Sequence, residues 1–237
     1  MNKKAIILAL SIIMLTGCGK KKEDTHSTKS NKTSVESSEK VKDDNKSNTN
    51  KDKENKEAKK IDDDSFVNPR NIGKTIGNDQ LDYEIKKAGV KENEYTTGPF
   101  KVKITGVSAG IMTPKSEEMK SFLQDKENTQ VIILFATVEN TEDKKANLYL
   151  NQSLITTDTQ EQLEPDLLLS EGSGEFLSAV KQDMTMVYYP QTDVEKTKEI
   201  VLHVEAPSDE NFETIGDELK ITITFNDQGN LNLLNKY

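Results

Sequence analysis

An alternation of apolar and polar side chains runs through the second half of the chain. Phe100, Val102 and Ile104 are apolar and the residues between them are polar, a period of two that is typical of strands with one buried face. Residues 131–138 are apolar on both faces, which predicts a central strand. Further strands are predicted at 147–150, 154–157, 184–189, 200–204, 219–225 and, as a short edge, 231–234.

One helix is predicted among these strands, at residues 115–123. Met119, Phe122 and Leu123 recur there at helical spacing after Pro114. Short strands separated by turns, with little helix, predict a mainly β fold and a β-sandwich over 99–237. Segment 65–98 is interrupted by proline and glycines, and one short element is predicted in it at 81–85. Its pattern leaves open whether it packs on the sandwich.

The N-terminus has a different pattern. Lys3 and Lys4 precede an apolar run of eleven residues, 5–15, which has the length of a signal-peptide core and is too short to span a bilayer. The run ends in Leu15-Thr16-Gly17-Cys18, which resembles the lipobox of bacterial lipoproteins. The resemblance implies a signal peptide at 1–17, recognised by its peptidase at Leu15, Thr16 and Gly17. It also implies a lipid on Cys18 that anchors the chain to the extracytoplasmic face of the cell membrane.

Residues 18–64 are almost entirely polar and charged, which predicts a disordered tether because such a segment cannot bury apolar surface. Residues 19–60 carry 13 lysines and 9 acidic residues. Residues 61–237 carry 17 basic and 32 acidic residues, a formal net charge of −15. So acidic a domain argues against a nucleic-acid partner and against close contact with anionic lipid headgroups.

The residue types that carry catalysis are scarce. Cys18 is the only cysteine, so a disulfide, a thiolate metal site and a cysteine nucleophile are excluded once it is lipidated. No serine lies in a G-x-S-x-G motif, and His203 is predicted on the solvent side of its strand. We therefore expect a protein that is not an enzyme and that has no cofactor. No EF-hand loop is present, and the loose acidic group of 62–64 with Asp79 is the best candidate for calcium.

Two apolar segments are candidates for a partner surface. Leu167, Leu168 and Leu169 are consecutive, so they form either a fully buried strand or a patch that is partly exposed. The strand that ends in Tyr188 and Tyr189 raises the same alternative between core packing and an interaction surface. These five residues form the candidate partner surface.

The order of strands and turns over 99–226 resembles the extracellular immunoglobulin-like domains of bacterial lipoproteins, including the MPT63-like (DUF4352) group. The resemblance lies in an Asn-led turn at 138–143, a hairpin at 153–163 and a strand at 183–189. The chain departs from it at Lys181-Gln182, where the group has Pro-Gly, and at Gln160, where the group has glycine. The resemblance implies an immunoglobulin-like sandwich, but no activity, since the function of most members is unassigned.

The sequence thus predicts a lipid-anchored lipoprotein that presents an immunoglobulin-like binding domain to an envelope or secreted protein. The alternative is an envelope protein that binds a small molecule or calcium. The two share the anchor and the fold, and differ in the ligand.

Overall fold

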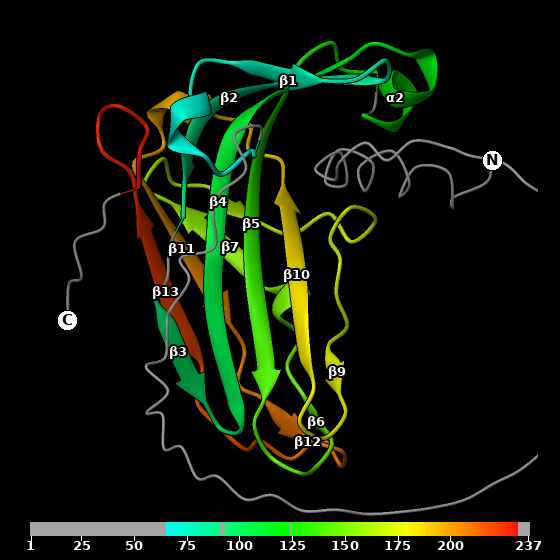
Figure 1. Cartoon of the computed structure of the whole chain (residues 1–237), viewed down its shortest axis with the longest axis vertical. Helices are drawn as coiled ribbons and strands as arrows, with labels where there is room; N and C mark the ends of the chain where they lie inside the picture. Colours follow the sequence, from blue (N-terminus) through cyan, green and yellow to red (C-terminus); the bar gives the residue numbers. More distant parts are fainter. Residues whose placement is uncertain (1–64, 91–92, 124, 232–237) are drawn as a thin grey trace, which may run out of the picture. The chain divides into compact units, whose positions relative to one another are not determined.

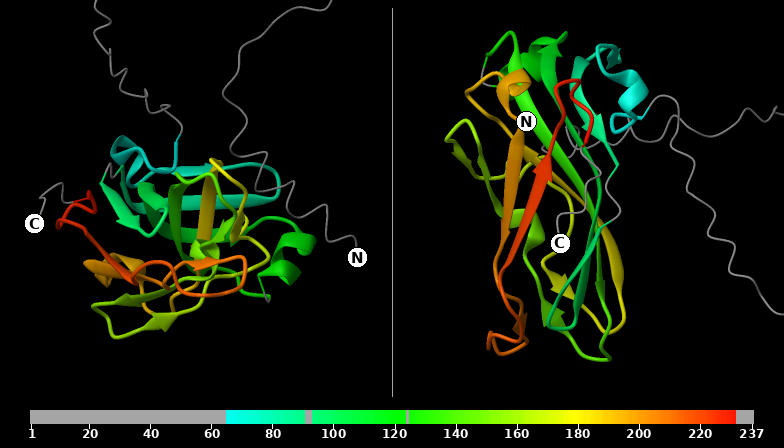
Figure 2. Two further views of the ribbon diagram at one scale, coloured as in Figure 1. Left: turned by 90° about the horizontal axis from the view of Figure 1, so that it is seen from below. Right: turned by 90° about the vertical axis from the view of Figure 1, so that its left-hand side faces the viewer.

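The computed structural model describes residues 65–90, 93–123 and 125–231. The predicted signal peptide, the lipobox with Cys18, the tether 18–64 and the acidic residues 62–64 lie outside the described residues. The described part is a sandwich of two antiparallel sheets with a third, small sheet at one end (Figure 1). In Figure 2, the strands β11 and β13 form one layer and the strands β4 and β5 the other. The prediction of a mainly β sandwich with one short helix is confirmed.

The larger sheet has six strands, in the order β1-β2-β4-β5-β10, with β3 also paired to β4. Its strands are β1 (Thr75–Gly77), β2 (Leu81–Gly89), β3 (Glu94–Thr97), β4 (Phe100–Pro114), β5 (Thr129–Asn140) and β10 (Lys181–Tyr188). Strand β5 lies between β4 and β10, so the prediction of a central strand at 131–138 is confirmed.

The second sheet has the order β13-β11-β7-β8, and the small sheet has the order β12-β6-β9. Their strands are β6 (Ala146–Asn147), β7 (Leu154–Thr157), β8 (Gln162–Leu163), β9 (Glu175–Phe176), β11 (Glu199–Val204), β12 (Ser208–Asp209) and β13 (Leu219–Thr224). The helical turns are η1 (Pro69–Asn71), α2 (Glu117–Phe122), η2 (Leu150–Gln152) and η3 (Val194–Lys196). Of the strand predicted at 231–234, only Leu231 is described, and it bridges to Phe225.

The main core lies between the two large sheets. Alternate residues of β5 point into it, from Ile132 to Val138, and they meet the inward residues of β11 and β13, among them Leu202 and Ile221. All of these side chains are fully buried. The alternation read from the sequence therefore separates core positions from outward positions in these strands.

A second apolar cluster covers part of the opposite face of the six-stranded sheet. Val131 and Ile133 of β5 belong to it, together with Tyr83 of β2. Met119 of α2, Leu169 and further residues of β2, β4 and β10 also belong to it. The six-stranded sheet is thus apolar on both faces, which explains the continuous apolar run in β5.

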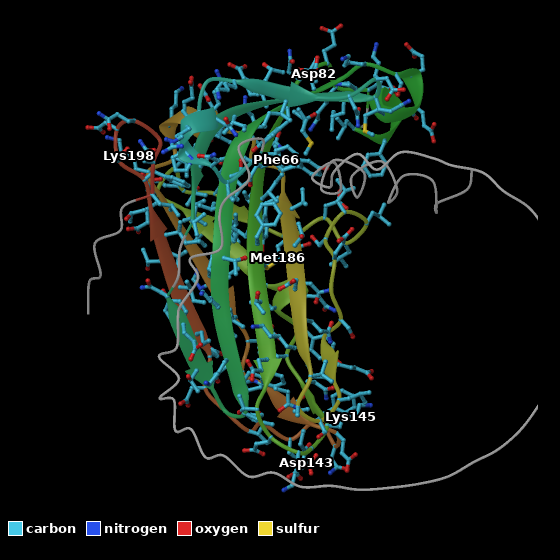
Figure 3. The ribbon with its side chains drawn as sticks, viewed as in Figure 1. Phe66, Asp82, Asp143, Lys145, Met186 and Lys198 are labelled. Carbon is cyan, nitrogen blue, oxygen red and sulfur yellow. The ribbon has the colours of Figure 1, made fainter. Side chains whose placement is uncertain are left out.

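Segment 65–98, which the sequence left open, is part of the sandwich. Strand β2 pairs with the second half of β4 and β3 pairs with the first half. Phe66 packs edge-on against Tyr83, with ring centroids 5.4 Å apart (Figure 3). The β domain therefore begins well before residue 99, the boundary drawn from the sequence.

The predicted helix at 115–123 is confirmed, although it is shorter. α2 begins after Ser116, whose Oγ accepts a hydrogen bond from the Met119 N–H at 3.2 Å. This N-cap satisfies one of the donors that a helix leaves unpaired at its start. Met119 is the buried residue of the helix and anchors it on the second cluster.

Candidate interaction surfaces

The three consecutive leucines lie in a tight turn and not in a buried strand. We call residues 166–170 the leucine turn. Leu167 is 63% exposed and Leu168 is 64% exposed, while Leu169 is only 4% exposed. The interpretation of all three as a fully buried strand is wrong, because only Leu169 reaches the second cluster. The alternative, a partly exposed patch, describes Leu167 and Leu168.

The leucine turn is held by its own first residue. Asp166 Oδ1 accepts hydrogen bonds from the N–H groups of Leu168, at 2.8 Å, and Leu169, at 3.3 Å. The Asp166 carbonyl accepts the Ser170 N–H at 2.8 Å. An Asp side chain that caps a turn in this way favours a single backbone conformation. Leu167 and Leu168 are therefore presented on a fixed backbone.

The leucine turn and Glu171, which follows it, cover part of the outer edge of β10. Asp166 N–H donates to the Val187 carbonyl at 2.7 Å, and Val187 N–H donates to Ser170 Oγ at 3.1 Å. Glu171 and Thr185 exchange two backbone hydrogen bonds of 2.8 and 3.1 Å. An edge strand covered in this way does not offer its backbone to another strand. A partner at this side of the molecule would thus contact side chains of the turn.

Tyr188 and Tyr189 point to opposite sides of the sheet. Tyr188 is fully buried in the main core, and its hydroxyl donates to the Ser153 carbonyl at 2.9 Å. Its inclusion in the partner surface is wrong, because period-two alternation places it with Met184 and Met186 inside. Tyr189 is half-buried and packs against the second cluster. It stays in the candidate surface with Leu167 and Leu168.

Stability should decrease at alkaline pH because of three tyrosines. Burial raises the pKa of Tyr83 far above its usual value despite its hydrogen bond to Ser108. Burial also raises the pKa of Tyr188 and, with the Asp166 carboxylate, that of Tyr189. The tyrosines of the unfolded chain lose their protons at about pH 10. The contribution of these three tyrosines to the free energy of unfolding is therefore complete below this pH, and it is lost as the pH rises above it.

Thermal unfolding measured from about pH 8 to about pH 11 tests this expectation. The unfolding midpoint should decrease above about pH 10, and Tyr83→Phe should make the decrease less steep. Burial lowers the pKa of Lys87, so this lysine opposes the loss of stability with rising pH. It is a single group, whereas three tyrosines cause the loss. A midpoint that does not fall up to about pH 11 would contradict the account.

A second group of exposed apolar side chains, which the sequence analysis missed, lies at the end of the sandwich formed by β6, β9 and β12 (Figure 1). Phe212 is 74% exposed and Leu177 is 67% exposed, and Ile215 is exposed as well. Asp209 of β12 and Phe176 of β9 both pair with Ala146 of the middle strand. Asp209 and Phe176 therefore lie about 10 Å apart, on either side of β6. Phe212 and Leu177 follow them closely in the chain, so both lie at the same end of the small sheet.

The backbone of Phe212 is in the left-handed region, with φ of +64°. This conformation costs a bulky residue about 1–2 kcal/mol. Asp209 Oδ1 holds this backbone conformation by accepting hydrogen bonds from the N–H groups of Asn211, at 2.8 Å, and Glu213, at 2.9 Å. The hydrogen bond from the Glu213 N–H is the main cause that holds the pKa of Asp209 below its usual value. The hydrogen bonds from Asn211 act in the same direction. Sequence alone offers one signal for this loop, a single aromatic residue among acidic ones.

The other chemical candidates stay isolated. His203 is half-buried on the outer face of β11, where its Nε2 lies 2.9 Å from Thr156 Oγ1. Among the residues that the structure describes, no three His, Cys, Asp or Glu side chains are close enough to hold a metal ion. Asp79 is exposed, and its suggested partners at 62–64 are not described. Within the described ranges, no helix has the length and hydropathy needed to cross a membrane.

The fold and its exposed turns define a β-sandwich with two candidate contact surfaces. No protein-family profile matches the chain, and no curated protein matches it. The chain is similar, at low identity, to solved structures, three of which come from Listeria and Bacillus. A functionally unknown protein from Listeria monocytogenes EGD-e is 11% identical, with a TM-score of 0.44 over 59% of this chain and 86% of that one.

The other two structures come from Bacillus. A proposed lipoprotein, ycdA, from Bacillus subtilis subsp. subtilis str. 168 is 12% identical, with a TM-score of 0.35 over 54% of this chain and 38% of that one. A conserved hypothetical protein from Bacillus anthracis is 12% identical, with a TM-score of 0.35 over 54% of this chain and 93% of that one. Similarity at this level carries no argument about function.

Proposed function

We propose that the chain is a lipid-anchored extracytoplasmic protein whose sandwich binds an envelope or secreted protein through the leucine turn. The observation that carries this proposal is the exposure of two adjacent leucines, 63% and 64%, on a turn whose backbone is held by Asp166. Leu169 alone packs against the sheet. Folding therefore does not require the side chains of Leu167 and Leu168 to be apolar.

The arrangement favours binding in two ways. A turn fixed in advance loses little conformational entropy when a partner docks, so more of the contact energy is available for affinity. Apolar side chains at the centre of an interface contribute most of the energy when water is excluded around them. Tyr189, half-buried on the same side of β10 as Leu169, would extend the apolar area.

The lipobox supports the location of this domain. Cys18 follows Leu15, Thr16 and Gly17 directly after an apolar run of signal-peptide length. A lipid there would hold the sandwich at the membrane on a tether of 47 residues, 18–64. The strongly acidic composition of 61–237 favours a protein partner over nucleic acid or an anionic lipid surface.

The test places a photoreactive amino acid at position 168 of the full-length lipoprotein on living cells. Illumination should crosslink one dominant protein, from position 168 and also from position 189. With the photoreactive group at position 189, the double variant Leu167→Gln, Leu168→Gln should give at least about 90% less of that product than the chain with both leucines. The control carries the photoreactive group at exposed Lys220 of β13, on the other sheet. Equal capture from positions 168 and 220 would refute the proposal.

A further inference from the structure

The loop of residues 208–218, which we call the acidic loop, exposes an aromatic side chain that the fold does not use. Phe212 is 74% exposed and lies at its tip. Its ring makes no contact with another aromatic ring or with a cation among the described residues. Its backbone is nevertheless held in the left-handed region, where asparagine or glycine would be less strained. Local structure alone would therefore favour another residue type here.

The acidic loop is fixed at both of its stems. On one side, Asn147 Nδ2 donates to the Asp209 carbonyl at 2.8 Å, and β12 pairs with β6. On the other side, Asp217 N–H donates to Thr97 Oγ1 at 2.9 Å. Gly216 lies against the backbone of Gly98, so closely that a Cβ at 216 would come within 2.6 Å of the Gly98 nitrogen. Phe212 is thus presented on a rigid platform.

The loop carries charge of a single sign. Residues 208–218 contain five acidic residues, Asp209, Glu210, Glu213, Asp217 and Glu218, and no lysine or arginine. The neighbouring turn, 141–145, has two acidic and two basic residues and is formally neutral. Its Lys145 pairs with Glu175 at 3.1 Å, and Lys145 and Asp143 both lie at this end of the sandwich (Figure 3). Phe212 therefore lies in a loop with a formal charge of −5, beside a turn that is formally neutral.

We propose that the acidic loop is a second docking site, at which Phe212 enters an apolar pocket of a partner protein whose rim carries lysine and arginine side chains. A rigid, exposed aromatic side chain is the type of residue that dominates binding energy at protein interfaces. Acidic residues around it steer a basic surface toward the loop and disfavour acidic partners. Leu177, exposed at the same end, adds apolar area beside the pocket. This site is additional to the leucine turn and does not depend on it.

The first test uses the full-length lipoprotein on living cells, with the photoreactive amino acid at position 212 and, as the control, at Lys220. Position 212 should capture a protein that position 220 does not, and the crosslinked peptide should lie beside lysine or arginine residues in that protein. The charge reversal Glu210→Lys with Glu213→Lys should reduce the yield at least about ten-fold. Identical products from both positions, or a yield that the reversal leaves unchanged, would overturn the proposal.

The second test separates binding from folding. Phe212→Asn removes the ring and places a residue that tolerates the left-handed conformation at this position. The affinity for the captured protein should fall at least about ten-fold, the thermal unfolding midpoint should not fall, and Phe212→Tyr should retain most of the affinity. Unchanged affinity of Phe212→Asn would contradict the proposal. Capture from position 168 without specific capture from position 212 would refute the second site and leave the leucine turn as the contact surface.

Discussion

Replacing Phe176 with alanine is expected to destabilise the sandwich by about 3–5 kcal/mol. Phe176 is fully buried, and its ring packs edge-on against that of Phe100 with centroids 5.1 Å apart. It belongs to β9 of the small sheet and, at the same time, to the main core. The substitution therefore leaves a cavity where the small sheet joins the rest of the domain. Denaturant-induced unfolding measures the effect as a lower midpoint with an unchanged slope.

Leu177→Ala is the matched control for this change. Leu177 is the next residue in the chain but is 67% exposed, and its truncation should alter the free energy of unfolding by less than about 0.5 kcal/mol. The contrast between adjacent apolar residues tests the burial pattern directly. A loss of less than about 1 kcal/mol for Phe176→Ala would show that the small sheet does not share the main core.

Replacing Cys18 with serine is expected to release the protein into the medium. The thiol is the group that takes the lipid in the lipoproteins that residues 15–18 resemble, and the chain has no second cysteine. An anchor of two acyl chains holds a protein stably on a membrane, whereas the polar segment 18–64 offers no apolar surface in its place. The variant should therefore move from the membrane fraction to the culture supernatant.

Cell fractionation with a cytoplasmic marker as the lysis control measures this redistribution. Labelling with a radioactive fatty acid gives an independent readout, because the wild-type chain should take up the label and Cys18→Ser should not. Retention of the variant in the membrane fraction at the wild-type level would contradict lipid anchoring at Cys18.

The sequence predicts the strands where the alternation is uninterrupted. Where a β-bulge breaks the alternation, the predicted range is shorter than the strand. In β4, the register shifts between Ile104 and Gly106. Val107 and Ala109 then point into the core, out of phase with the earlier residues. Val67 packs where a side chain on Gly106 would lie. The pattern that identified the start of this strand therefore does not continue through its second half.

Strand β2 was only partly recognised, for a related reason. Its register shifts between Ile85 and Lys87, and Lys87 is buried although lysine is rarely buried. Its Nζ donates to the Glu195 carbonyl at 3.1 Å and lies 5.4 Å from the centre of the Phe225 ring. These partners lie far away in the sequence, so no local pattern could predict the burial.

Burial divides the five residues of the candidate surface. The alternation along 184–189 puts Tyr188 on the same face as Met184 and Met186, and Tyr189 on the other face. It does not tell which face is buried, and the structure places Tyr188 in the main core. The division of the leucine turn was not predictable, because it depends on which of the three leucines reaches α2 and β5. Gln160, where the resembled group has glycine, has the left-handed φ of +67° that glycine would favour.

The affinity of the partner captured at position 168 for the full-length chain tests the central claim most directly. Leu167→Gln with Leu168→Gln should weaken binding at least about ten-fold, while the thermal unfolding midpoint stays at the wild-type value because both side chains are exposed. This result would establish the sandwich as a binding domain that uses the leucine turn. Equal affinity of the wild-type chain and the double variant would contradict that account.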